Sequence, residues 1–158
     1  MTEHAVTPSH PPQALLRAVN PALRFLLATP LAGSARKQIM VLNFTGRKSG
    51  RRYSVPVSAH LIDGDLYAIA SAGWKANFGD GAAAEVLYDG RRTTMRGQLI
   101  RDPAAVADLA LRAAQSYGAA KAQRMMGLKF RDGHIPSLED FTEAARREGM
   151  GAIRFSPA

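Results

Sequence analysis

A short basic segment, residues 45–52 with the sequence TGRKSGRR, carries the residue types best suited to holding an anion. Its glycines permit positive φ and a close approach of the backbone, so that backbone N–H groups can converge on an oxyanion. Arg47 and Arg51 can each form paired hydrogen bonds with phosphate or carboxylate oxygens, and Lys48 adds a point charge. Ser49 adds a hydroxyl donor. The segment predicts an anion site, and the alternative is a solvated basic turn.

A second segment, residues 70–78 with the sequence ASAGWKANF, can supply an aromatic wall. Trp74 is the single tryptophan, and Asn77 follows it three positions later. That spacing places both residues on one face of a helical turn. Trp74 can then flank a flat heterocycle while Asn77 fixes its polar edge. The alternative is a core tryptophan beside a capping asparagine.

Other patterns in the chain do not support a site. The GDGAAA segment at residues 79–84 matches a dinucleotide-binding pattern, but a β-prone run follows it where that mechanism needs a helix. The four histidines, His4, His10, His60 and His134, show no metal-ligand spacing, and the chain has no cysteine. We therefore expect no metal site and no thiol chemistry. His60 alternates with apolar neighbours, which indicates an exposed or hydrogen-bonded strand histidine.

Taken in chain order, these segments resemble the deazaflavin-dependent nitroreductase family. The similarity extends over residues 20–101 and is most specific where TGRKSG is followed by a VPV strand. The segments that carry it are NP at 20–21, PLAG at 30–33, LNFTGRKSG at 42–50, VPV at 55–57, DGD at 63–65, AS at 70–71 and WKANF at 74–78.

The resemblance implies a split β-barrel of the flavin-reductase-like type and the cofactor coenzyme F-420. This cofactor is a deazaflavin with a phosphate and a glutamate tail, and FMN is the alternative. By their position in the motif, Arg47, Lys48 and Ser49 would hold the anionic tail. The ring system would contact the other motif residues, namely Pro56, Val57, Ala70, Ser71, Ala72, Trp74 and Asn77.

The same resemblance implies an oxidoreductase of the nitroreductase or quinone reductase type. The reduced deazaflavin would deliver hydride to a quinone, an enone or a nitro compound, with Ser71 and Tyr117 as candidate catalytic proton donors. The alternatives are a non-catalytic flavin-, heme- or lipid-binding split barrel and a basic nucleic-acid-binding barrel. Aromatic residues make up only 7% of the chain, and only Tyr53 adjoins the basic cluster, which argues against nucleic acid.

Composition sets the broader limits. The chain has 158 residues, of which 46% are hydrophobic, which is enough for one domain with its own core. A formal net charge of +8 points to an anionic partner, such as a phosphorylated small molecule, nucleic acid or an acidic membrane surface. The polar N-terminus shows no signal peptide, and no apolar run is long enough for a membrane span. We therefore expect a cytoplasmic protein.

The N-terminal part is expected to differ from the rest of the chain. Residues 1–11 read as a flexible tail, and residues 12–158 as a single split-barrel domain. Apolar residues at helical spacing predict a helix over residues 12–27, interrupted at Asn20-Pro21. This helix would either pack on the barrel or lie on an anionic membrane surface. The family resemblance also implies a homodimer.

The remaining pattern predicts strands followed by helices. Alternation and the turn signals Asp63-Gly64 and Asp89-Gly90 favour hairpins, and Pro56 favours an edge strand or a bulge. The expected strands are 38–45, 53–61, 66–71, 85–88, 93–101 and 152–155, and the expected helices are 102–117, 119–126 and 138–147, the last capped by Ser137 and ended by Gly149. The predicted fold is an α+β, six-stranded antiparallel split β-barrel with N-terminal and C-terminal helices.

Overall fold

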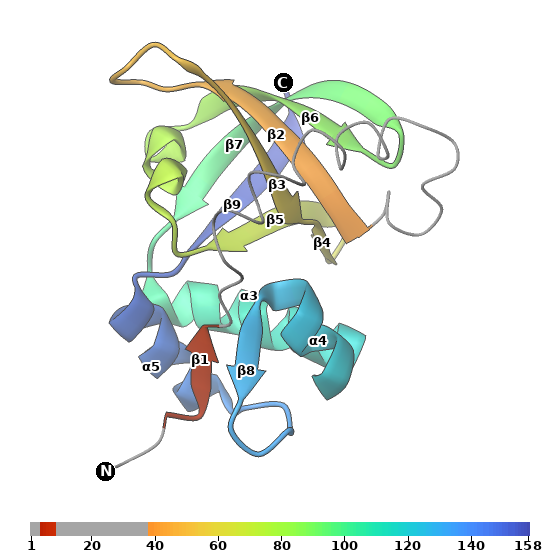
Figure 1. Cartoon of the computed structure of the whole chain (residues 1–158), viewed down its shortest axis with the longest axis vertical. Helices are drawn as coiled ribbons and strands as arrows, with labels where there is room; N and C mark the ends of the chain where they lie inside the picture. Colours follow the sequence, from red (N-terminus) through yellow and green to blue (C-terminus); the bar gives the residue numbers. More distant parts are fainter. Residues whose placement is uncertain (1–3, 9–37) are drawn as a thin grey trace, which may run out of the picture.

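The structure, a computed structural model, describes residues 4–8 and 38–158. It has the predicted α+β class: a curled antiparallel sheet forms a half-open barrel, and helices gather at one end of it (Figure 1). The sheet has seven strands in the order β3-β2-β6-β7-β9-β5-β4, and a separate ribbon pairs β1 with β8. The elements are β1 (Val6–Pro8), β2 (Ile39–Thr45), β3 (Arg52–Ser58), β4 (His60–Ile62), β5 (Asp65–Ala70), η2 (Gly73–Phe78), β6 (Ala82–Tyr88), β7 (Arg91–Ile100), α3 (Pro103–Tyr117), α4 (Ala119–Met126), β8 (Leu128–Phe130), α5 (Leu138–Glu148) and β9 (Gly151–Pro157).

One residue, Ala59, links the two edges of the sheet. β3 and β4 follow each other in the chain but stand at opposite ends of the strand order. The sheet must therefore curl until its edges approach, and at this corner Ala59 N donates to the backbone oxygen of Gln38 (2.8 Å). The prediction of one strand over residues 53–61, and so of six strands, was wrong. Ala59 and His60 are both buried, which breaks the in–out alternation of a single strand. Pro56 lies on the edge strand β3, as predicted.

Two short strands were not anticipated by the sequence. β1 pairs antiparallel with β8, so part of the segment expected to be a tail belongs to the fold. Val6 is only 1% exposed and packs into the core beneath the barrel. Strands of three residues carry too little alternation to produce a sequence pattern. The helix expected over residues 12–27 lies outside the described residues.

Both predicted hairpin turns are present. Asp63-Gly64 joins β4 to β5, and Asp89-Gly90 joins β6 to β7. All four residues have positive φ, between 51° and 85°, as a two-residue turn of the favoured hairpin type requires. β6 begins at Ala82, so the GDGAAA segment leads into a strand.

Alternate residues of the strands fill the barrel interior. Leu42 and Phe44 of β2 are buried in the same cluster as Phe78 and Phe155. Gly97 of β7 makes room for the two rings, since a Cβ there would lie 2.7 Å from Phe78 and 2.9 Å from Phe155. The core therefore fixes η2 against β7 and β9.

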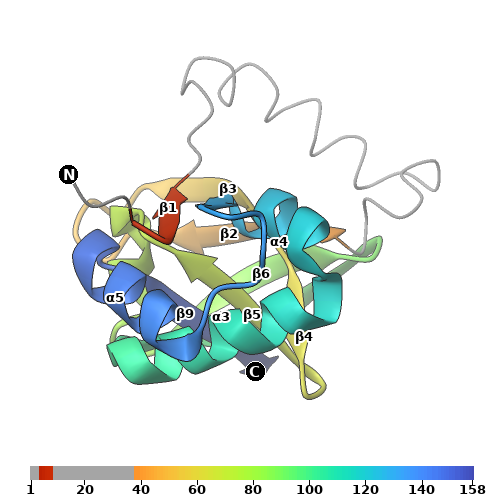
Figure 2. The ribbon, with the colours of Figure 1, turned by 90° about the horizontal axis from the view of Figure 1, so that it is seen from below.

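The helices form a second layer beneath the barrel. Figure 2 shows α3 crossing under the strands with α4 and α5 beside it. α3 begins at Pro103 after the capping residue Asp102, and α5 has a capping box of Ser137 with Asp140 and ends before Gly149. These are close to the predicted boundaries because capping residues mark them in the sequence. All three helices precede β9, which returns to the sheet between β7 and β5.

Among the described residues, no helix is both long enough and apolar enough to cross a membrane.

Candidate anion-binding site

The TGRKSGRR segment forms the turn between β2 and β3, called the basic turn below. Gly46 N donates to Arg51 O (2.7 Å), and Gly50 N donates to Gly46 O (2.9 Å). Gly50 has φ +70°, a conformation that favours glycine. Ser49 Oγ accepts a hydrogen bond from Arg51 N (3.2 Å). The basic turn is therefore held in one conformation by its own hydrogen bonds.

Gly46 connects the basic turn to the barrel core. A Cβ at this position would lie 2.6 Å from the Tyr53 ring and 2.8 Å from Ser49 Oγ, so a larger residue would force one of them away. Tyr53 stacks on Phe44, with ring centroids 5.6 Å apart. Because Phe44 is part of the barrel interior, the turn is anchored through an aromatic contact.

The side chain of Asn77 joins η2 to the basic turn. Asn77 Nδ2 donates to Trp74 O (2.7 Å), and Arg47 N donates to Asn77 Oδ1 (2.9 Å). The predicted helical turn that carries Trp74 and Asn77 is present as η2. The Asn77 oxygen, which the sequence assigned to a ligand's polar edge, accepts a hydrogen bond from the backbone of the turn.

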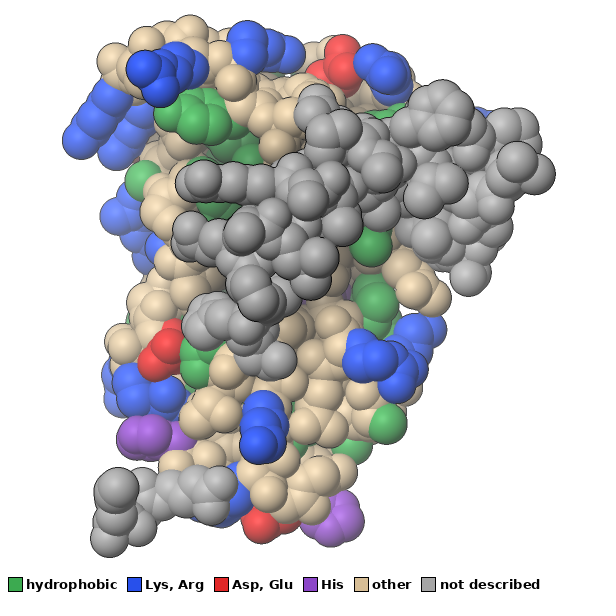
Figure 3. Space-filling model, viewed as in Figure 1, with side chains coloured by type: hydrophobic (Ala, Val, Ile, Leu, Met, Phe, Trp, Pro, Cys, Tyr) green, Lys and Arg blue, Asp and Glu red, His purple; other side chains and the backbone are tan. Residues whose placement is uncertain are grey.

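The basic turn and η2 together line a cavity of about 240 Å³. The described residues that line it are Gly46, Arg47, Lys48, Ser49, Tyr53, Gly73, Ala76 and Asn77. No carboxylate is among them, and within residues 4–8 and 38–158 the Arg47 and Lys48 side chains have no hydrogen-bond or ion-pair partner. Both side chains are exposed. Figure 3 shows Lys and Arg side chains gathered at this end of the molecule. The site can therefore attract an anion without first breaking an ion pair.

Trp74 belongs partly to the core and partly to the surface. Its ring centroid lies 6.0 Å from that of Phe44 and 6.3 Å from that of Phe78. The side chain is half-buried and is not among the residues that line the cavity at the basic turn. The core interpretation of Trp74 therefore holds for the buried part of its side chain, and only the exposed part is left for a ligand.

Pro56 and Val57 are neighbours in β3 and therefore point to opposite faces of the sheet. Val57 lies opposite Met40 and packs against the barrel interior, whereas Pro56 lies opposite Val41. Only one of these two side chains can face a ligand on a given side of β3. Their contact with one ring system stays a prediction.

The strand end expected to line the ring lies beside η2. β5 ends at Ala70, and Ser71 and Ala72 are exposed. Lys75 Nζ donates to the backbone oxygens of Ser71 (3.1 Å) and Ala72 (3.3 Å). None of these residues lines the cavity at the basic turn, so their contact with a ring stays a prediction. Lys75 was not singled out from the sequence, because nothing in its spacing distinguishes it.

Tyr117 is not brought to this cavity. It ends α3, and its hydroxyl lies 2.7 Å from Nδ1 of His60. Burial lowers the pKa of His60 to about 4. Burial, with a smaller contribution from Tyr88, raises the pKa of Tyr117 to about 12. Both groups are therefore neutral near pH 7, and His60 is the hydrogen-bonded strand histidine that the sequence allowed. In the described part of the chain, no group of three His, Asp or Glu side chains is placed to hold a metal ion.

No protein-family model and no curated protein sequence matches the chain. Two solved structures share a general likeness. One, described as a domain-swapped dimer, is 15% identical over 92% of this chain and 100% of its own, with a TM-score of 0.45. The other, the conserved hypothetical protein Rv2991 from Mycobacterium tuberculosis, is 12% identical over 99% of this chain and 86% of its own, with a TM-score of 0.46. At these scores neither likeness assigns a family or an activity to this chain.

Proposed function

We propose that this protein binds coenzyme F-420 at the basic turn and η2 and acts as an oxidoreductase on an electron-poor small molecule. One observation carries the proposal. The unpaired cations of the turn and the tryptophan-bearing segment, far apart in the chain, are joined by the hydrogen bond from Arg47 N to Asn77 Oδ1 (2.9 Å). Two of the segments that carry the resemblance to the deazaflavin-dependent family, the basic turn and η2, therefore lie side by side.

The described residues fit the anionic end of such a cofactor. Arg47 and Lys48 offer unpaired positive charge, and Ser49 offers a hydroxyl. A cavity of about 240 Å³ is below the usual size of a pocket for a whole drug-sized ligand. It suits a phosphate or carboxylate group, and the ring would lie outside it, along the exposed edge at Ser71 and beside Trp74.

The chain's own contribution would be binding and orientation. When bound in its reduced form, the deazaflavin supplies the hydride, and the protein supplies position and electrostatics. Arg47 and Lys48 would fix the anionic tail, and Asn77 would keep the basic turn in place. The exposed hydroxyl of Ser71 is available as a proton donor beside solvent. The electron acceptor would be a quinone, an enone or a nitro compound, as the family resemblance implies.

His60 does not support the heme-binding alternative. A heme ligand must present a free imidazole nitrogen to an open cavity, whereas His60 is 1% exposed and its Nδ1 is bonded to Tyr117. A single-stranded nucleic acid would need several exposed aromatic side chains along a basic groove. Among the described residues, Tyr53 is the one exposed aromatic side chain, and its ring also stacks on Phe44.

A fluorescence titration of the purified full-length protein tests the proposal. The ligands are coenzyme F-420, FMN and a short single-stranded oligonucleotide. We expect the tightest binding for coenzyme F-420, because its tail offers more anionic groups to the basic turn than the single phosphate of FMN. Equal or tighter binding of FMN would refute the cofactor choice, and preferential binding of the oligonucleotide would refute the enzyme class.

A further inference from the structure

A second cavity, of about 440 Å³, lies between η2, the end of β7 and the end of α5. We call it the η2–α5 cavity. Three basic side chains line it, Lys75, Arg101 and Arg146, over an apolar floor that includes Leu99 and Met150. No Asp or Glu is among its described lining residues. Since η2, the loop after β7 and α5 contribute these cations, the cavity concentrates positive charge that no described residue in its lining neutralises.

Lys75 is held in place at this cavity. Its Nζ donates to the backbone oxygens of Ser71 and Ala72. Its carbon stem packs beside Gly151, where a Cβ would lie 3.1 Å from Lys75 Cδ. Burial lowers the pKa of Lys75, and the positive charge of Arg101 lowers it further. The second cause means that the two cations repel each other across the cavity, a cost that a bound anion would remove.

Arg101 and Arg146 lack the carboxylate partners that other arginines have. Arg112 pairs with Asp63 and Asp108, and Arg154 pairs with Asp65. By contrast, within the described residues no hydrogen-bond acceptor or carboxylate is paired with the side chain of Arg101 or Arg146.

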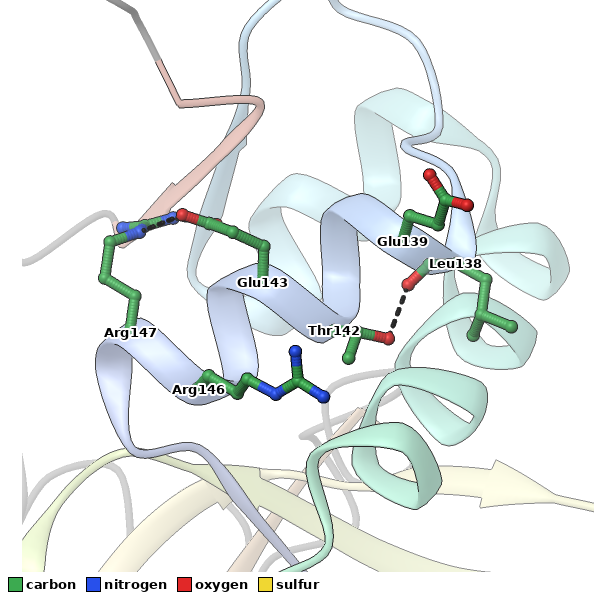
Figure 4. A pocket seen from close by; sticks show the side chains of 6 residues that line it. All are labelled: Leu138, Glu139, Thr142, Glu143, Arg146 and Arg147. Carbon is green, nitrogen blue, oxygen red and sulfur yellow. Dashed lines mark hydrogen bonds and ion pairs between the residues drawn. The ribbon is translucent and has the colours of Figure 1, made fainter.

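The nearest acidic residues in the chain are already engaged. Asp102 caps α3 by accepting a hydrogen bond from Ala105 N (3.2 Å). Glu143 and Glu148 both pair with Arg147. Figure 4 shows Arg147 turned toward Glu143, while Arg146 extends along another side of α5, away from that pair. The positive charge of the η2–α5 cavity is therefore not neutralised by the acidic residues next to it in the sequence.

The groove drawn in Figure 4 runs along the outer side of α5 and is a poorer candidate. It shares Arg146 with the η2–α5 cavity, but a single helix supplies its described lining, and Glu139 and Glu143 are part of it. Mixed charge on one exposed helix face is typical of a solvated surface. The η2–α5 cavity differs in both respects, because it joins separate elements and carries one sign of charge.

We propose that the η2–α5 cavity is a second anion site, which binds a small molecule bearing a phosphate or more than one carboxylate. Arginine forks and a lysine ammonium are the groups that recognise such oxyanions. A cavity of about 440 Å³ is of the size that small-molecule ligands occupy. Ala76 of η2 lines both this cavity and the one at the basic turn, so the two sites are neighbours that use different cations. The inference does not rest on the proposed function.

An NMR titration of the full-length protein with pyrophosphate tests the site, and a parallel titration with citrate separates phosphate from carboxylate recognition. We expect saturable shifts of the backbone amides of Lys75, Ala76 and Gly149. The double variant Arg101→Gln, Arg146→Gln should weaken the affinity that produces these shifts at least tenfold. Arg124→Gln is the matched control, because Arg124 is an exposed helical arginine that has no partner among the described residues; it should leave the affinity unchanged.

Two results would overturn the site. One is that shifts scatter over all basic surfaces without saturating. The other is that Arg124→Gln weakens binding as much as the double variant does, since net charge alone would then explain the effect. Arg47→Ala separates this inference from the proposed function. It should leave the shifts at Lys75 and Gly149 intact even if the protein binds no deazaflavin.

Discussion

Asn77 shows how a single side chain can determine whether a charged segment becomes a site. Both ends of its amide are used, one for Trp74 O and one for Arg47 N. Without it, the basic turn would still have its internal bonds between Gly46, Gly50 and Arg51. It would, however, lose its attachment to η2, and with that the second wall of the cavity. Residue types alone suggested an anion site in the basic turn. The attachment of this turn to η2, however, depends on a hydrogen bond between Arg47 and Asn77, which are thirty positions apart in the chain.

Two of the four cations of the basic turn, Arg47 and Lys48, give the first prediction. Arg47→Ala and Lys48→Ala should each weaken coenzyme F-420 binding by about tenfold to a hundredfold, because a charge-assisted hydrogen bond contributes roughly 1.5–3 kcal/mol. The loss should shrink as salt is raised, since ions screen exposed charges. Fluorescence titration measures both effects, with Arg124→Ala as the control for net charge. A folded double variant that binds like the parent protein would show that the turn is only a solvated loop.

His60 gives a prediction about pH. Its pKa falls from 6.5 to about 4 in the folded protein, so between these values the unfolded chain binds a proton that the folded chain does not. The contribution of neutral His60 to the free energy of unfolding is therefore fully present above pH 6.5 and is lost as the pH falls toward 4. The loss amounts to about 3 kcal/mol.

Urea unfolding of the parent protein and His60→Gln at a series of pH values measures this effect. The difference in free energy of unfolding between the two should narrow by up to about 3 kcal/mol from pH 7 to pH 4. Carboxylates that titrate in the same range act on both proteins and cancel in the difference. A difference that stays constant with pH would mean that His60 is not neutralised by burial.

At the scale of elements, the sequence predicted those helix ends and hairpins that a capping residue or a turn residue marks. Asp102-Pro103 and the Ser137 capping box located α3 and α5, and Asp-Gly pairs located two hairpins. β1 and β8 were missed because three residues carry no periodicity. The break at Ala59 depends on which residues the curled sheet buries. The η2–α5 cavity was also not predictable, because Lys75, Arg101 and Arg146 meet only after packing.

The contact of η2 with the barrel gives a prediction at this scale. Gly97→Ala should destabilise the protein by about 1–3 kcal/mol, because the added Cβ would meet the Phe78 and Phe155 rings and overpack the core. Gly73→Ala is the matched control, since a Cβ there meets nothing within 4 Å and its φ is not positive. Thermal or urea unfolding compares the two. Equal stability of both variants would contradict the close packing of η2.

At the scale of the whole molecule, the described N-terminal residues attach to the layer beneath the barrel. Besides the pairing of β1 with β8, Arg147 Nη2 donates to the backbone oxygen of Val6 (2.5 Å), and His4 lies 3.1 Å from Glu143. A segment that the sequence marked as a tail thus contacts α5. Polar composition gave that impression because, of the described residues 4–8, only Val6 is deeply buried.

Val6→Ala gives the prediction that belongs here. The variant should lose about 1–2 kcal/mol of stability, because the deleted methyl groups leave a gap beneath the barrel. Thr7→Ala, at the next position in β1, is the control and should cost less, since Thr7 is only partly buried. Denaturant midpoints of the two variants make the comparison. If Val6→Ala were as stable as the parent protein, β1 would not be part of the cooperative fold.

The position of β9 has a consequence for how the protein can be made in the cell. β9 pairs with both β5 and β7, yet it begins at Gly151, after all three helices. While the ribosome is still synthesising the helices, β5 and β7 each have one edge whose backbone N–H and C=O groups lack the partner strand β9. The barrel can therefore close only after the three helices and β9 have left the exit tunnel, so the sheet is completed later than the helices are synthesised. During that interval the nascent sheet has exposed edges of the kind that chaperones shield from neighbouring chains.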